Sequence, residues 1–159
     1  MRRTLKLAFI VSTLVGIALP HAACSQERPD SVAMQGAAVS HGAQAVEWET
    51  EWARAFERAR TEGKVVVADF YADWCVWCKH MDGTTFQDAK VTELMAERVV
   101  PLKLDTDRGG RDLAVELRVQ NLPTIVIFDV DGDELGRIPG YASPASFVAS
   151  LNEFLSREG

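Results

Sequence analysis

The sequence predicts an α/β domain in which a mixed central β-sheet carries helices on both faces. Apolar, β-branched runs alternate along the chain with segments of helical periodicity, which predicts two β-α-β arrangements. The last two predicted strands are joined by a short turn, which predicts a final hairpin. A chain of 159 residues is long enough for one such domain.

The first 23 residues have the layout of a secretory signal peptide. A basic start with Arg2, Arg3 and Lys6 precedes an apolar run over residues 7–19 and an exit of small residues. This run is shorter than the roughly 20 residues that span a bilayer, although an uncleaved membrane anchor is the alternative. We therefore expect an exported protein that works in the periplasm.

Cys24 follows this segment and has two interpretations. It could be the lipid-bearing first residue of a bacterial lipoprotein, although His21 stands where that signature has an aliphatic residue. Alternatively, ordinary cleavage falls before Gln26. Residues 24–45 are rich in Ser, Gln, Ala and Gly, which predicts a flexible tether ahead of a folded domain at 46–159. A lipid on Cys24 would attach this tether to a membrane.

The domain is expected to begin with a helix, a strand and a second helix. Apolar residues recur at helical spacing from Trp48 to Ala59, which predicts an amphipathic helix that ends at Gly63. Residues 65–71 are β-branched and aromatic, as in a buried strand. The following helix carries two cysteines and is interrupted at 82–83.

The second half of the domain continues the alternation, and Phe86 is expected to fill the core where it begins. The remaining predicted elements are a helix at 88–98, a strand at 99–104, a helix at 110–118, strands at 124–128 and 135–138, and a last helix from Pro144. The three aspartates within 129–133 suggest a calcium loop, but Gly140 stands where such a loop has Glu. A hairpin turn is therefore favoured.

Cys75 and Cys78 are separated by two residues and follow the first predicted strand directly. The first sulfur therefore lies at the start of a helix, where free backbone N–H groups and the helix dipole favour a thiolate. A thiolate attacks disulfides, and such sites lower a cysteine pKa from about 8.5 to roughly 3.5–7.5. Half of a zinc site is the alternative, but zinc needs four ligands and His80 is the nearby supply. We favour a redox dithiol without metal or organic cofactor.

Charge and cysteine content narrow the class of protein further. Removal of residues 1–23 leaves 14 Lys and Arg residues against 23 Asp and Glu, a net charge of about −9. This charge argues against nucleic acid and anionic membranes as direct partners. Three cysteines, only two of them close together, do not form a disulfide-stapled scaffold.

The runs VVVADFYADWCVWCK and NLPTIVIFDVDGDELGRIPGY resemble the thioredoxin family. Within that family, YADWCVWCK and the later TF are most similar to the C-terminal domain of the thiol:disulfide interchange protein DsbD and to related exported thioredoxin-like proteins. The resemblance covers roughly residues 45–157 and implies the thioredoxin fold.

The resemblance implies roles for four residues around the dithiol. Cys75 matches the attacking and more exposed cysteine, and Cys78 matches the resolving cysteine that releases the reduced partner. Asp69 matches an acid beneath the resolving cysteine, with a raised pKa and a general-base role, whereas an acid facing water at a strand edge is the alternative. Asp82 matches a second acid that tunes the thiols; an ordinary acid at a helix C-terminus is the alternative.

Four further residues are expected to contact a bound partner. Leu122 and Pro123 match the family's cis-proline loop, which offers backbone hydrogen bonds to an extended substrate; a proline that simply begins a strand is the alternative. Trp74 is expected to shield the sulfurs from water. Trp77 either contacts a partner or caps the sheet edge. Thioredoxin has Gly-Pro between its cysteines where this chain has Val and Trp, and this pair tunes the reduction potential.

These observations predict a periplasmic thiol–disulfide oxidoreductase that reduces disulfides in exported client proteins or relays electrons to them. The resemblance implies a membrane reductant carrier that reduces the enzyme again, and we expect a monomer. Two alternatives stay open, a disulfide oxidase or isomerase and a non-catalytic metallochaperone or binding module that uses the same thiols.

Overall fold

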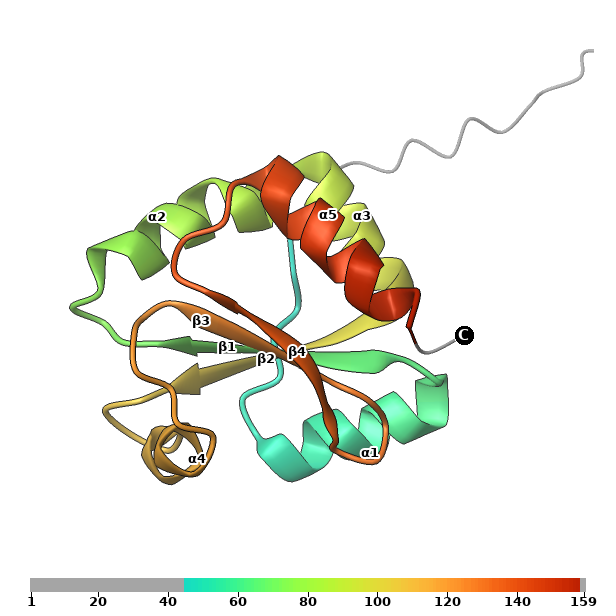
Figure 1. Ribbon diagram of the computed structural model, residues 1–159, viewed down its shortest axis with the longest axis horizontal. Helices are drawn as coiled ribbons and strands as arrows, with labels where there is room; N and C mark the ends of the chain where they lie inside the picture. The colour runs from blue at the N-terminus through green and yellow to red at the C-terminus, as the bar shows by residue number, and fades with distance from the viewer. Residues whose placement is uncertain (1–44, 158–159) are drawn as a thin grey trace, which may run out of the picture. The chain divides into compact units, whose positions relative to one another are not determined.

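The computed structural model describes residues 45–157 as a four-stranded sheet of order β2-β1-β3-β4 with helices on both faces (Figure 1). The predicted fold class is thereby confirmed. The predicted signal peptide, Cys24 and nearly all of the predicted tether lie outside the described residues. Within the described range, none of the helices combines the length and the apolar character that a membrane span needs. The elements are α1 (Trp52–Glu62), β1 (Val65–Tyr71), α2 (Val76–Gly83), η1 (Thr85–Gln87), α3 (Ala89–Arg98), β2 (Val99–Asp105), α4 (Arg111–Glu116), β3 (Thr124–Phe128), β4 (Glu134–Pro139) and α5 (Pro144–Leu155).

Strand β1 lies at the centre of the sheet. It runs parallel to β2, with Asp69 beside Lys103 in the register, and antiparallel to β3. Only the first of the two predicted β-α-β arrangements therefore joins parallel strands. The six residues of α4 rise about 9 Å, whereas the seven residues of β2 extend about 23 Å. Because α4 is too short to return along the sheet, β3 starts where β2 ends and runs the opposite way.

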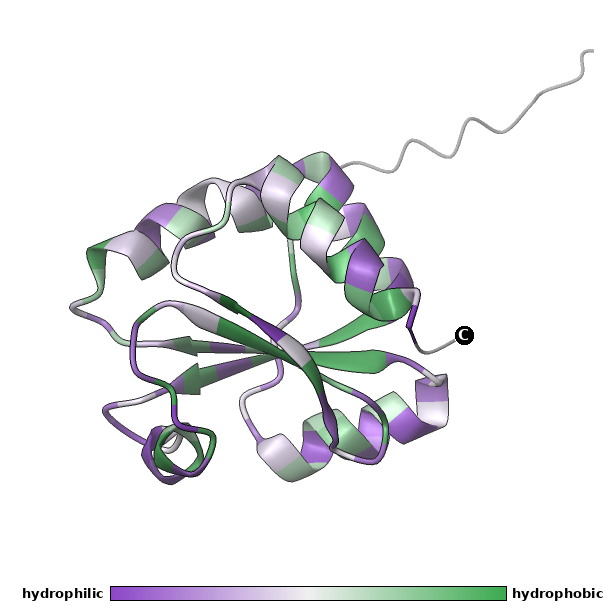
Figure 2. Cartoon of the chain, in the orientation of Figure 1, coloured by the Kyte–Doolittle hydropathy of each residue, from purple (hydrophilic) through white to green (hydrophobic). Residues whose placement is uncertain are grey.

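The side chains of the strands alternate between two cores. On one face, Val65 and Val67 of β1 pack in a cluster with residues of α2, η1, α3 and α5. On the other face, Val66 and Phe70 pack with residues of α1 and α4. The central strands are largely hydrophobic, whereas each helix alternates between hydrophobic and hydrophilic residues (Figure 2). Strand β1 is therefore covered on both faces, as its continuous apolar run predicts.

Helix α1 begins at Trp52, so the prediction that it includes Trp48 is wrong. The backbone of Glu49 pairs with β2 instead. The Glu49 N–H donates to the carbonyl of Pro101 at 2.9 Å, and the Lys103 N–H donates to the carbonyl of Glu49 at 2.8 Å. These bonds hold the segment before α1 in an extended conformation beside the sheet.

The two tryptophans consequently pack on opposite faces of the sheet. Trp48 meets the ring of Phe86 edge to face, with the centroids 4.9 Å apart. Trp52 packs against Phe128, with the centroids 5.2 Å apart. The helical spacing of the sequence would allow Trp48 to belong to α1 together with Trp52. The backbone pairing of Glu49 with β2 places Trp48 outside the helix instead.

Two aspartate carboxylates accept backbone N–H groups, one at the start of α3 and one in the β3–β4 turn. The Asp88 carboxylate caps α3 by accepting the N–H groups of Lys90 and Val91. The Asp129 carboxylate accepts three successive backbone N–H groups of the β3–β4 turn, each at 2.9 Å. Gly132 in this turn has a φ of 98°, a conformation that favours glycine. The predicted hairpin is confirmed, and Phe86 is buried as predicted.

Gly110 and Gly109 provide a matched test of packing under β2. A Cβ on Gly110 would lie 2.9 Å from the Cβ of Leu104 and 3.0 Å from the carbonyl oxygen of Asp105, whereas a Cβ on Gly109 meets nothing within 4 Å. The Gly110 backbone angles, φ −88° and ψ −4°, suit alanine, so the cost is steric. We expect Gly110→Ala to lower the free energy of unfolding by about 1–3 kcal/mol and Gly109→Ala by less than about 0.5 kcal/mol, as measured by urea unfolding. Equal losses would contradict this account.

Candidate active site

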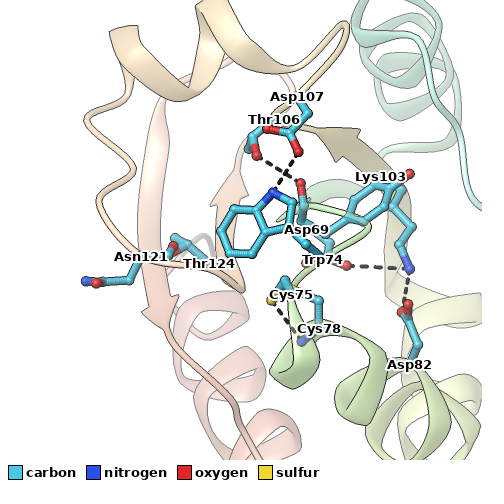
Figure 3. Close-up of a disulfide and its surroundings, with 11 residues drawn as sticks. Asp69, Trp74, Cys75, Cys78, Asp82, Lys103, Thr106, Asp107, Asn121 and Thr124 are labelled. Atoms are coloured by element: carbon cyan, nitrogen blue, oxygen red, sulfur yellow. Dashed lines mark hydrogen bonds and ion pairs between the residues drawn. A yellow bond between two sulfur atoms is a disulfide. The ribbon is translucent and has the colours of Figure 1, made fainter.

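Cys75 and Cys78 form a disulfide at the junction of β1 and α2, with an S–S distance of 2.09 Å (Figure 3). Cys75 is the N-cap residue of α2, and its sulfur accepts the backbone N–H of Cys78 at 3.1 Å. Free N–H groups at a helix N-terminus stabilise negative charge. The arrangement therefore favours the thiolate of Cys75 once the disulfide is reduced.

Both cysteines are buried in this disulfide form. Their residue exposures are 4% for Cys75 and 3% for Cys78, so the predicted greater exposure of Cys75 is not found. Ala72 belongs to the same buried cluster, and Tyr71 and Leu122 pack against it. These apolar contacts cover the two cysteines almost equally while the disulfide is intact.

Asp69 is buried within β1, which excludes the alternative of an acid facing water. Its residue exposure is 2%, and its Oδ1 has no hydrogen-bond partner among the described residues. Burial raises the pKa of Asp69 to about 7, and the ammonium of Lys103, 3.8 Å from Oδ2, opposes this rise. The carboxyl group therefore exchanges its proton near neutral pH.

Lys103 joins Asp69 to Asp82, as Figure 3 shows. Its ammonium lies between the Asp69 carboxyl on β1 and the Asp82 carboxylate on α2, and it donates a hydrogen bond to Asp82. Sequence reasoning missed Lys103, although a cation within the apolar run of β2 is a detectable signal. Asp82 and Asp69 are thus linked by the ammonium of Lys103, which contacts both.

The segment that precedes β3 lies beside the dithiol. The Leu122–Pro123 peptide bond is cis, and Leu122 packs against the cysteine cluster. The carbonyl of Pro123 accepts the N–H of Gly140 at 2.8 Å, and the Thr124 hydroxyl donates to the preceding turn. The fold thus brings this loop, distant in the sequence, beside the disulfide.

Two exposed tryptophans flank the dithiol. Trp74 is 68% exposed, and its indole N–H donates to the carboxylate of Asp107 at 2.7 Å. Trp77 is 58% exposed, and its ring lies 5.7 Å from His80 and 5.6 Å from Tyr141 between centroids. Both rings leave a large apolar surface open to a partner.

A hollow of about 280 Å³ adjoins Trp74. It is lined by Trp74, Thr106, Arg111, Ala114, Val115, Val119, Gln120, Asn121 and Leu122. A larger hollow of about 480 Å³ lies between α3, β2 and the segment before α1, and none of the predicted site residues lines it. The smaller hollow thus reaches Leu122, which packs against the cysteine cluster.

Within residues 45–157, the structure contains no group of three or more His, Cys, Asp or Glu side chains placed to hold a metal ion. His80 instead packs against Tyr141, with the ring centroids 4.9 Å apart.

Comparisons with known proteins agree with the fold. A family model described as a thioredoxin-like domain matches residues 52–155. The thiol:disulfide interchange protein DsbD of Salmonella typhi is 38% identical over 99 residues, which is 60% of this chain and 18% of that protein. DsbD of Ralstonia nicotianae is 38% identical over 105 residues, 64% of this chain and 17% of that protein. The chain thus spans about a fifth of the length of these relatives.

Two solved structures share the architecture. A thioredoxin from Thermus thermophilus superposes with a TM-score of 0.66 at 27% identity, covering 73% of this chain and 92% of that one. A DsbH oxidoreductase superposes with a TM-score of 0.65 at 20% identity, covering 86% of this chain and 95% of that one. At this identity, the second match concerns the fold alone.

Asp69 is expected to make the protein less stable as the pH rises. Its pKa of about 7 in the folded protein exceeds the unfolded value of about 3.9, so the folded state keeps a proton that the unfolded chain releases. The resulting stabilisation is complete below about pH 4 and is lost as the pH rises through about 7, by on the order of 4 kcal/mol.

The substitution Asp69→Asn keeps the shape of the side chain and removes its ionisation. We expect urea unfolding of the oxidised protein from pH 4.5 to 8 to show a steeper loss of stability in the wild type than in Asp69→Asn. Parallel stability curves for the two proteins would contradict the assignment of a neutral, buried carboxyl.

Proposed function

Because this chain belongs to the thioredoxin-like domain family, we propose that it is an exported thiol–disulfide oxidoreductase that reduces disulfides in other exported proteins or relays electrons to them. The observation that carries this proposal is the Cys75–Cys78 disulfide at the start of α2, beside a buried acid whose pKa lies near 7. The name thiol:disulfide interchange protein, borne by relatives that match over this domain, supports the same chemistry.

The proposed reaction passes two electrons from the reduced dithiol to the client. The Cys75 thiolate attacks one sulfur of the client disulfide, that S–S bond breaks, and the other client sulfur leaves as a thiolate that takes up a proton. Cys78 then attacks the sulfur of Cys75 in the mixed disulfide. The second client thiol is released, and the Cys75–Cys78 disulfide forms, which is the state that the structure contains.

Asp69 is the proposed base for the second step. Cys78 must lose a proton before it attacks, and a carboxyl with a pKa near the working pH can both accept and return that proton. Burial supplies this pKa, with Lys103 limiting the rise. Asp69 would take the proton of Cys78 directly or through one water molecule.

Partner contacts are proposed for the surface around the disulfide. Trp74 and Trp77 offer exposed rings there, and the loop of Leu122 and Pro123 lies against the dithiol. An extended client segment would lie along this loop and beside the hollow at Trp74.

Export is proposed from residues 1–23; Cys24 would either carry a lipid or be removed by ordinary cleavage before Gln26. The mass of the mature N-terminus distinguishes these two forms. In either form, the oxidised dithiol needs two electrons from a membrane carrier with its own dithiol before the next cycle.

The two cysteines are expected to respond differently to substitution. Cys75→Ser should abolish disulfide reduction, because the attacking sulfur is gone. Cys78→Ala should instead accumulate a mixed disulfide with the client, because the resolving sulfur is missing. Non-reducing gels and mass spectrometry of trapped adducts measure the difference. Full reducing activity in Cys75→Ser would contradict the proposal.

The reduction potential separates a reductase from an oxidase. We expect a redox titration of the Cys75–Cys78 pair to give a value closer to the roughly −270 mV of thioredoxin than to the roughly −120 mV of a strong oxidant. A value near −120 mV would favour the disulfide oxidase that the sequence leaves open.

A further inference from the structure

Lys103 lies in an aromatic cage formed by Trp48, Tyr71 and Phe86. Its Nζ is 4.9 Å from the ring centroid of Tyr71, 5.1 Å from that of Trp48 and 6.0 Å from that of Phe86. A cation within about 6 Å of the face of an aromatic ring is attracted by the quadrupole of the ring. The side chain of Lys103 is 16% exposed, so the rings replace much of the water around the ammonium.

The caged ammonium is the cation that contacts both acids of the site. It lies 3.8 Å from the carboxyl of Asp69 and donates a hydrogen bond to Asp82. Among the described residues, the Tyr71 ring faces the ammonium and packs against the cluster of Cys75 and Cys78. The charged groups that act on the Tyr71 hydroxyl are Asp105, Asp73, Arg108 and Asp69. Among the described residues, Lys103 forms the ion pair with Asp69, so its position governs the charge that Asp69 can carry.

A backbone hydrogen bond and a ring contact hold Trp48 in position beside the ammonium of Lys103. The backbone of the next residue, Glu49, accepts the N–H of Lys103 at 2.8 Å, so the segment that carries the ring is bonded to the residue that carries the cation. The edge-to-face contact with Phe86, at an interplanar angle of 76°, fixes the orientation of the ring.

We propose that Trp48 is a positioning residue for the dithiol chemistry: with Tyr71 and Phe86, its ring holds the Lys103 ammonium between the two acids and so sets how readily Asp69 exchanges a proton. This inference rests on the proposed function, in which Asp69 serves Cys78. It extends the site to the segment before α1.

The direction of the effect follows from the charges. The ammonium lowers the pKa of Asp69 against the effect of burial. Loss of the Trp48 ring loosens the ammonium, so the pKa of Asp69 rises further and less carboxylate is present at pH 7. We expect a rise of about half a pH unit, the size that one cation–π contact supplies.

The test is a carbon-13 NMR titration of the Asp69 carboxyl in the oxidised full chain, where the two cysteines do not titrate. Trp48→Leu should raise the midpoint by about half a unit, and Trp48→Phe should restore most of the wild-type value. Trp52→Leu is the matched control, because Trp52 packs against Phe128 on the other face of the sheet. An equal rise in Trp52→Leu, or none in Trp48→Leu, would overturn the inference.

A double-mutant cycle shows whether Trp48 acts through Lys103. Lys103→Met should raise the midpoint by more than Trp48→Leu does, and adding Trp48→Leu to Lys103→Met should change it by less than about 0.2 unit. A further half-unit rise in the double variant would overturn the inference. If Trp48→Leu does not fold, a fluorinated tryptophan placed at position 48 keeps the shape, weakens the quadrupole and should still raise the midpoint.

The titration also separates this inference from the proposed function. It needs no client and no turnover, so a wild-type protein that fails to reduce disulfides would overturn the proposed function while leaving the midpoints interpretable. Normal reducing activity with identical midpoints in wild type and Trp48→Leu would overturn the role of Trp48 alone.

Discussion

The carboxyl group of Asp69 is buried in the central strand, and one neighbouring cation, Lys103, keeps its pKa near neutral. Parallel pairing of β1 and β2 places Asp69 and Lys103 side by side. Without the cation, burial would keep the acid protonated well above neutral pH. Asp82 reaches the same ammonium from the last turn of α2. One positive charge on β2 thus joins the central strand β1 to the helix that begins at the dithiol, and the proton exchange of the site depends on it.

The direction of β3 is what assembles the rest of the site. Because β3 runs antiparallel to β1, its first residue, Thr124, lies beside Phe70 near the end of β1 that leads to the cysteines. The cis-proline loop precedes Thr124 and therefore reaches the disulfide. The loop after β2 emerges at the same end and supplies Asp107 to the indole of Trp74. A parallel β3 would have placed Pro123 at the opposite end of the sheet.

Local patterns in the sequence were sufficient for the dithiol, for the acid in β1 and for the two buried apolar strands. These features depend on the order of neighbouring residues, so they are visible without the fold. The position of Trp48, the direction of β3 and the role of Lys103 were not predictable in this way. Each depends on hydrogen bonds or ion pairs between segments far apart in the chain. The helical spacing at Trp48 is genuine, yet two backbone bonds to β2 outweigh it.

The pairing of Glu49 with β2 also covers part of one edge of the sheet. An open edge strand can recruit strands of other molecules and lead to aggregation. Here the outer edge of β2 is partly occupied by the chain's own backbone at Glu49. At the other side, β4 ends in Pro139, which has no N–H to donate, and carries the charged pair of Glu134 and Arg137. Both margins are therefore poor templates for the addition of a strand from another molecule.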